Sequence, residues 1–301
     1  MSARYRFEIL GRLTVTCDGV PVPLGAAKLR ILLAALVVEA GRVVPVDVLV
    51  ERLWQDRPPA GARNAVQNYV LRLRRLIGAE VVRTDRRGYV ADIAPGLVDA
   101  HRFSALVDQG RGALARADPQ RAAVLLGDAL GQWNGDPLSD LPPEPFRDVV
   151  SALCEQRIAA HELWADALIR CGRAAETLVE LRRLTERHPL HERFWEQRML
   201  ALYQCGRQGE ALAAYRSAAG ILAEELGVDP GADLKAMHQR VLTAAPEIAP
   251  VRRASRSAGN LPAETTSFIG REYELAEVKR LLATSRLVTL TGVGGVGKTR
   301  L

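Results

Sequence analysis

The chain has 301 residues, of which 48% are apolar and 25% are charged. These proportions are typical of a globular protein with room for two or three domains, and they exclude a disordered or fibrous chain. The net charge of +6 is concentrated at one end, because residues 1–95 hold 15 of the 41 Lys and Arg residues but only 9 of the 35 Asp and Glu residues. A basic domain of this kind is typical of a protein that binds a polyanion.

Membrane and metal sites are not indicated. The longest apolar run, Ile31–Val38, is far shorter than the ~20 residues that cross a bilayer, and the opening residues lack a signal-peptide layout. The four cysteines are isolated, without a CxxC pair or a matched histidine spacing. His188 and His191 flank Pro189 in an expected turn, where a capping or surface role is favoured. We therefore expect a cytoplasmic protein with reduced thiols, no metal and no membrane partner.

In chain order, short apolar runs and turn signals first predict a small antiparallel sheet. Its candidate strands are Tyr5–Leu10, Leu13–Cys17 and Val20–Val22. Helical periodicity and breakers then predict three helices. They are Ala26–Glu39, Val46–Trp54 and Ala62–Ile77. Two more strands, Val81–Thr84 and Tyr89–Ile93, flank a turn at residues 85–88. Three helices between two β elements predict an OmpR-type winged helix over residues 1–97.

The third helix has an apolar stripe on one side and amides and arginines on the other. The apolar side, which we expect to pack, consists of Val66, Tyr69, Val70, Leu73 and Leu76. The polar side consists of Asn64, Gln67, Asn68, Arg72 and Arg75. Asn and Gln can form two hydrogen bonds with an adenine edge and Arg with a guanine edge, whereas further guanidinium groups neutralise phosphates. This pattern predicts a recognition helix for the DNA major groove, with Asn68 and Arg72 at its centre.

A basic hairpin follows directly, and we expect its turn to contact phosphate beside the adjacent minor groove. The predicted DNA-binding residues are Arg63, Asn64, Gln67, Asn68, Arg72, Arg74, Arg75, Arg83, Arg86 and Arg87. The alternative is a core helix whose basic face is merely solvated. The mixture of amides with arginines, and the second basic element, favour DNA binding.

Residues 98–245 are rich in Ala, Leu and Arg and predict helices with almost no strand. An internal repeat is visible, because Cys171-Gly172-Arg173 recurs 34 residues later as Cys205-Gly206-Arg207. Thirty-four residues is about the tetratricopeptide period, in which stacked helix pairs form a surface for binding rather than catalysis. The whole chain is therefore expected to be mainly α with a small β component.

Residues 246–262, with three prolines and three arginines, predict a linker. The pattern next predicts a helix at Glu272–Leu282 and a strand at Leu287–Thr291, followed by a GxxxxGKT phosphate loop. Residues 263–301 therefore resemble the start of a P-loop NTPase domain. Its nucleotide-binding residues would be Gly292, Gly294, Gly295, Gly297, Lys298 and Thr299. No Walker B strand follows in this sequence, so we expect these residues to be vestigial here. No cofactor is then required, and ATP with Mg²⁺ would serve only a longer form with a complete NTPase domain.

Several stretches together resemble the Streptomyces antibiotic regulatory protein family in its larger, AfsR-type form. In the winged helix they are Leu53-Trp54, Arg63-Asn64 and Leu73-Arg74-Arg75; in the next domain, similar to the bacterial transcriptional activation domain, they are residues 188–193, 201–203, 206–207, 210–212 and 223–230. The resemblance implies an activator that binds direct repeats near a promoter as a dimer or paired protomers. It further implies recruitment of RNA polymerase through its sigma factor, often at antibiotic biosynthesis genes.

Two departures from the family pattern concern DNA recognition. Ala65-Val66 stands where relatives commonly carry Thr-Leu, which affects the operator sequence. Arg86-Arg87 replaces a more glycine-rich wing turn, which suggests stronger phosphate contact.

Two other classes of function compete with an activator. A nucleotide-regulated signalling ATPase would need more than an isolated phosphate loop, and no nucleophile with its base is apparent, so we expect no enzyme. A tetratricopeptide-like interaction scaffold would leave the localised positive charge unexplained. A response regulator would carry a receiver domain before the winged helix, and none precedes it in this sequence.

Overall fold

A computed structural model describes residues 5–249, 277–278, 280–281, 289 and 291. The chain divides into two compact units, residues 1–253 and 254–301. The predicted phosphate-loop residues, Gly292, Gly294, Gly295, Gly297, Lys298 and Thr299, lie outside the described residues. Where the predicted helix Glu272–Leu282 is described, at residues 277–278 and 280–281, it is helical. None of the described helices is long and apolar enough to cross a membrane.

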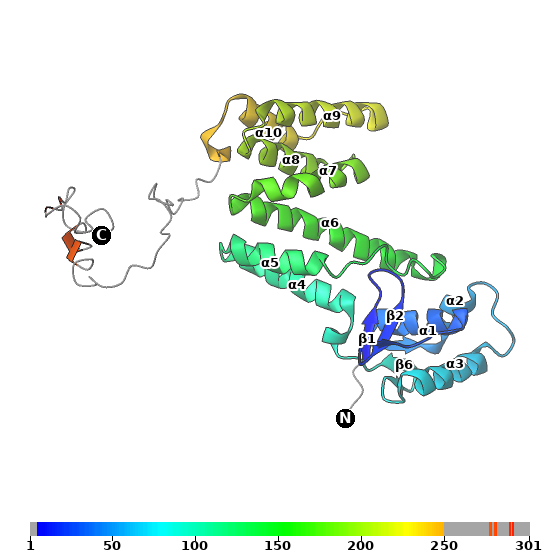
Figure 1. The fold of residues 1–301 in the computed structure, drawn as a ribbon. Coiled ribbons are helices and arrows are strands. Elements are labelled where there is room, and N and C mark those ends of the chain that lie inside the picture. Colours follow the sequence, from blue (N-terminus) through cyan, green and yellow to red (C-terminus); the bar gives the residue numbers. More distant parts are fainter. Residues whose placement is uncertain (1–4, 250–276, 279, 282–288, 290, 292–301) are drawn as a thin grey trace. The chain divides into compact units, whose positions relative to one another are not determined.

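The N-terminal part of the first unit is a winged helix (Figure 1). Its first sheet is antiparallel, in the order β1 (Tyr5–Glu8), β2 (Thr14–Cys17) and β3 (Val20–Pro21). Its three helices are α1 (Ala27–Val38), α2 (Val46–Trp54) and α3 (Ala62–Ile77). The second sheet has the order β4-β6-β5, formed by β4 (Val43–Pro45), β5 (Val82–Thr84) and β6 (Gly88–Ala91). The predicted elements are confirmed, whereas the short β4 was not expected.

Hydrophobic patterning explains the packing of these helices. Helix α1 is apolar on nearly all sides, and residues 31–37 are all buried, so it forms the centre of the three-helix group. Helices α2 and α3 are amphipathic and each contacts α1 with its apolar side. The wing strand β6 approaches β4 so closely that a Cβ at Gly88 would lie 1.9 Å from the Val44 carbonyl oxygen. Only glycine fits at that position of the hairpin.

The rest of the first unit is a stack of helices (Figure 1). They are α4 (Asp99–Ala115), α5 (Pro119–Leu130), α6 (Arg147–Arg170), α7 (Leu178–Arg187), α8 (Glu192–Gln204), α9 (Gln208–Leu226) and α10 (Ala232–Leu242). Short 3₁₀ turns η1 (Pro95–Leu97), η2 (Glu144–Phe146), η3 (Ala174–Thr177) and η4 (Pro246–Ile248) connect or end them. Ile248 is buried against the last helices, so packed structure extends past the predicted boundary at residue 245.

The internal repeat is visible in the backbone. Arg173 N–H donates to the Leu168 carbonyl oxygen and, 34 positions later, Arg207 N–H donates to the Leu202 carbonyl oxygen, both at 2.9 Å. The glycine before each arginine has a positive φ, 69° at Gly172 and 77° at Gly206. Each arginine then pairs with the glutamate three positions on. The same helix-ending turn therefore occurs twice, as the tetratricopeptide-like spacing predicts.

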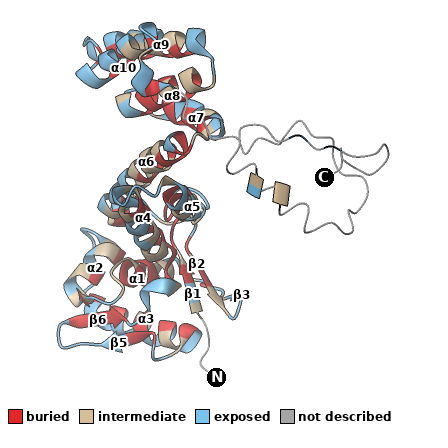
Figure 2. Cartoon of the chain, turned by 90° about the vertical axis from the view of Figure 1, so that its left-hand side faces the viewer, coloured by how far each residue is buried: buried red, intermediate tan, exposed pale blue. Residues whose placement is uncertain are grey.

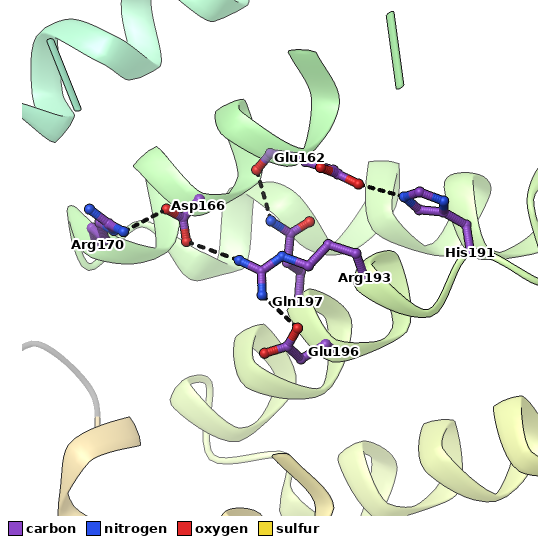
Figure 3. Close-up of polar contacts among 7 residues, drawn as sticks. All are labelled: Glu162, Asp166, Arg170, His191, Arg193, Glu196 and Gln197. Atoms are coloured by element: carbon purple, nitrogen blue, oxygen red, sulfur yellow. Dashed lines mark hydrogen bonds and ion pairs between the residues drawn. The ribbon is translucent and has the colours of Figure 1, made fainter. Parts of the chain in front are cut away.

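A polar network joins α6 to α8 within this stack (Figure 3). Glu162 on α6 contacts His191 Nε2 through its carboxylate at 2.5 Å and accepts a hydrogen bond from Gln197 Nε2 through its backbone oxygen at 2.8 Å. Arg193 lies between Asp166 at 3.7 Å and Glu196 at 2.5 Å. These contacts involve the stretch at residues 188–193 that carries the family resemblance, and they fix the angle between neighbouring helices.

The winged helix shares one hydrophobic core with the first helices of the stack, α4 to α6. A single cluster of buried residues runs from Phe7 in β1 through α1 and α4 to Leu168 in α6. Figure 2 shows buried segments in red on each of these helices. Asp99, at the start of α4, is 2% exposed and accepts hydrogen bonds from the N–H groups of Ile9 and Leu10 at 2.9 Å. The loop before α6 adds backbone hydrogen bonds to the same β1–β2 segment. The winged helix is thereby packed and hydrogen-bonded directly against the stack.

The cysteine, histidine and acidic side chains of the described residues do not form a cluster that could bind a metal ion. None of the four cysteines, Cys17, Cys154, Cys171 and Cys205, forms a disulfide among the described residues. No cluster of three or more His, Cys, Asp or Glu side chains suited to a metal occurs in the described part of the chain.

Candidate DNA-binding surface

Helix α3 buries one side and presents the other. Its buried residues are Ala62, Val66, Val70, Leu73 and Ile77, spaced three or four apart. Tyr69 is half-buried against the Trp54 ring of α2, with ring centroids 6.3 Å apart. The prediction that Leu76 packs is wrong, because Leu76 is 39% exposed and the buried position in that turn is Ile77. The buried stripe follows the 3.6-residue period and ends at Ile77, one residue after Leu76, the last residue of the predicted apolar side.

The predicted base-reading residues lie together on the exposed side. Asn64, Gln67, Asn68, Arg72 and Arg75 are all exposed. None of their side chains forms a hydrogen bond or ion pair with another described residue. Their amide and guanidinium donors are therefore available for a ligand along more than two turns of one helix. Amide and guanidinium groups at this spacing match the acceptors and donors of base edges in a major groove.

Three of the other predicted arginines have partners within the fold. Arg74 donates from Nε to the Val82 carbonyl oxygen and from Nη2 to the Thr84 hydroxyl, both at 2.8 Å. Those bonds tie α3 to β5 and give Arg74 a positioning role rather than leaving it free for DNA. Arg63 pairs with Asp47 at 2.6 Å, and Arg83 pairs with Asp92 at 2.7 Å.

These last two pairs are exposed. Their arginines can still reach a phosphate, but the neighbouring carboxylates offset part of the positive charge.

The wing turn presents its two arginines outward. The Asp85 carboxylate accepts a hydrogen bond from the Arg87 N–H at 3.0 Å, and the Asp85 N–H donates to the Gly88 carbonyl oxygen at 2.9 Å. These bonds fix the tight turn. Arg86 and Arg87 at its tip are exposed and have no ion pair among the described residues. Two unpaired guanidinium groups on a short rigid hairpin are well suited to phosphate.

One residue of this surface was not predicted from the sequence. Leu71 is 50% exposed and lies at the centre of the polar face, between Asn68 and Arg75 and one turn beyond Gln67. Exposing a large apolar side chain to water is unfavourable, so contact with an apolar group of a ligand would stabilise Leu71 in this position. Its signal in the sequence was its spacing of three from Asn68 and four from Gln67 and Arg75, which places it on the predicted binding side.

Comparisons with known proteins match both parts of this structure. A family model described as "transcriptional regulatory protein, C terminal" matches residues 19–91, a range that contains all ten predicted DNA-binding residues. A model of the bacterial transcriptional activator domain matches residues 98–242. The regulatory protein DnrI of Streptomyces peucetius is 36% identical over 255 residues, which cover 81% of this chain and 94% of DnrI.

The chain belongs to the Streptomyces antibiotic regulatory protein family. It is a DNA-binding transcriptional regulator, and its family members are regulators rather than enzymes. The regulatory protein AfsR of Streptomyces coelicolor is 36% identical over 318 residues, covering 100% of this chain but 32% of AfsR. The transcriptional regulatory protein EmbR of Mycobacterium tuberculosis is 39% identical over 268 residues, covering 86% of this chain and 68% of EmbR.

A solved EmbR structure also matches this member of the family. That structure, of Mycobacterium tuberculosis EmbR in complex with a low-affinity phosphopeptide, superposes with a TM-score of 0.79 at 39% identity. The match covers 81% of this chain and 66% of the EmbR chain, so this chain spans about two thirds of EmbR and about a third of AfsR. The shared architecture is a winged helix followed by a helical activator domain.

Proposed function

We propose that this regulator activates transcription by placing α3 in the major groove of promoter DNA, with the wing against the adjacent minor groove. The observation that carries the proposal is the row of unpartnered amides and arginines on the exposed side of α3, next to a wing tip with two free arginines. Asn68 and Arg72 contact base edges, with Asn64, Gln67 and Arg75 beside them. Arg63 and Arg83 contact phosphate, and Arg74 orients the wing.

Leu71 reads a thymine in this arrangement, because the thymine C5-methyl group is the apolar feature that base edges present in the major groove. Leu71→Ala should weaken binding to the tightest duplex selected from a random library by about 1 kcal/mol, or roughly fivefold. Replacing one thymine by uracil, which deletes only the methyl group, should cost the wild-type chain about the same.

The two changes should not add, because both remove the same contact. Gel-shift titrations of both proteins on thymine and uracil duplexes measure this coupling, and fully additive losses at every thymine would refute it. Leu190→Ala, at an exposed leucine of the helical stack, provides the matched control.

Arg86 and Arg87 bind backbone phosphate through the wing. Replacing both with alanine should make the negative slope of log affinity against log salt less steep, by about 0.9 for each phosphate that the wing no longer neutralises. The preference for particular bases should be kept. Fluorescence anisotropy from low to high salt measures the slope. An unchanged slope would remove the wing from the interface.

Two protomers bind side by side on direct repeats. The helical stack, which Asp99 joins to the winged helix, contacts RNA polymerase and its sigma factor. The activator-domain match at residues 98–242 supports this assignment, and membership of the Streptomyces antibiotic regulatory protein family supports secondary-metabolite genes as targets. Footprinting on the neighbouring regulatory region, followed by transcription with purified polymerase, tests both points. A single unrepeated protected site, or protection without activation, would contradict them.

DNA binding needs no cofactor and involves no catalysis, because its contacts come from α3 and the wing alone. Adding ATP with Mg²⁺ should leave the gel-shift affinity unchanged within twofold, and Lys298→Ala should behave as the wild type. If the purified chain hydrolysed ATP and Lys298→Ala abolished that activity, the proposal that this chain involves no catalysis would be wrong.

A further inference from the structure

A second polar site lies far along the chain from α3, between α6 and α7. These two helices are neighbours in the stack (Figure 1). Residues of these two helices line a pocket of about 180 Å³, together with Asp136 from the loop before α6. Its basic side chains are Arg157 and His161 from α6, Arg183 and Arg187 from α7, and His188 from the following turn. The acidic residues that face them are Glu180 of α7 and Asp136 of the loop.

His161 lines the pocket and has an unused hydrogen-bonding atom. Its side chain is 9% exposed, and its Nδ1 has no hydrogen-bond partner among the described residues. The nearest carboxylate oxygen, on Glu180, is 3.9 Å away, which is too far for a hydrogen bond. A buried polar atom without a partner is costly and uncommon. The imidazole therefore keeps an unused hydrogen-bonding atom in the wall of this pocket.

The positive charge of the pocket is incompletely balanced. Asp136 pairs with Arg187 at 3.1 Å and Glu180 pairs with Arg183 at 3.7 Å. Arg157 has no ion pair with a described residue, and its guanidinium lies 4.7 Å from the centroid of the Trp133 ring.

This excess charge acts on the neighbouring groups. Burial first, and then the charges of Arg157 and His188, lower the pKa of His161 to about 4. Burial and Arg187 also lower the pKa of Arg157. A half-buried guanidinium next to a neutral imidazole forms an anion-binding pair, with a cation and a hydrogen-bond donor one helical turn apart.

We propose that this pocket binds the phosphate or carboxylate group of a small molecule, held by Arg157 and by His161 Nδ1. The pocket is smaller than the roughly 300–1,000 Å³ that drug-sized ligands occupy, so it fits a compact anion or the acidic group of a larger ligand that extends past Arg183 and Arg187. Because the site lies on α6 and α7, it is independent of the DNA contacts.

Titration of the full chain with inorganic phosphate, and separately with acetate, tests the proposal at constant ionic strength. NMR of ¹⁵N-histidine-labelled protein reports the site directly. Saturating anion should shift the His161 signals and raise the pKa of His161, because an anion favours the imidazolium form. The stronger of the two probes identifies the ligand class.

Arg157→Gln should weaken the response at least tenfold, and Arg157→Lys, which keeps the charge over Trp133, should weaken it less. Arg182→Gln is the matched control, because Arg182 is adjacent to Arg183 on α7, is exposed and pairs with Glu186. A saturable response that Arg157→Gln reduces and Arg182→Gln preserves supports the site. No response to either probe, or an equal response in both variants, would overturn it without affecting DNA binding.

Discussion

Arg72→Ala is expected to cost roughly 1–3 kcal/mol of binding free energy on the cognate site and much less on random duplex DNA. Arg72 is exposed on α3 without a partner among the described residues, so its substitution removes a ligand contact without disturbing the fold. Asn68→Ala, one turn away, should have an effect of the same size at a different base pair. Competition gel shifts against every single-base variant of the selected site measure both losses.

The matched control for Arg72 is Arg111→Ala in α4, which removes the same charge from an exposed arginine outside the winged helix. That variant should bind within experimental error of the wild type on both kinds of DNA. If Arg72→Ala weakened cognate and random DNA equally, Arg72 would be a phosphate contact and not a base contact.

The second large effect concerns stability. Asp99→Ala should lower the free energy of unfolding by roughly 2–5 kcal/mol, because the buried N–H groups of Ile9 and Leu10 lose their acceptor. Asp99→Asn should cost less. It keeps one acceptor oxygen and removes a charge that burial disfavours, as the raised pKa of Asp99 indicates.

Urea unfolding followed by circular dichroism measures these differences. Asp108→Ala, on the same helix but 73% exposed, is the control and should change stability by less than about 0.5 kcal/mol. A loss for Asp99→Ala no larger than the control would mean that the junction between the winged helix and the stack contributes little.

Local periodicity was sufficient for much of this fold. The bounds of α2 and α3 agree with the prediction, because each helix has a strong apolar stripe between clear breakers. Strand β4 was missed because its three residues are strand only through pairing with β6, which is distant in sequence. The role of Asp99 was likewise invisible, since its partners lie about 90 residues earlier.

The sequence predicted most, but not all, of the candidate DNA-binding surface. Helical spacing placed the amides and arginines of α3 on one side, and the structure leaves five of them free. Spacing could not show that Arg74 is bound to β5, because the position of that strand depends on tertiary packing. Leu71 was also missed, although its spacing from Gln67, Asn68 and Arg75 places it on the same side of the helix, where it is 50% exposed.

Chemical probing with dimethyl sulfate tests the central claim most directly, because this reagent methylates guanine N7 in the major groove and adenine N3 in the minor groove. On the tightest selected duplex, the full chain should protect guanine N7 positions beneath α3 and adenine N3 positions beneath the wing. Arg72→Ala should restore methylation at one guanine and leave the others protected. Guanine N7 positions that react as freely with the protein as without it would contradict recognition through α3 in the major groove.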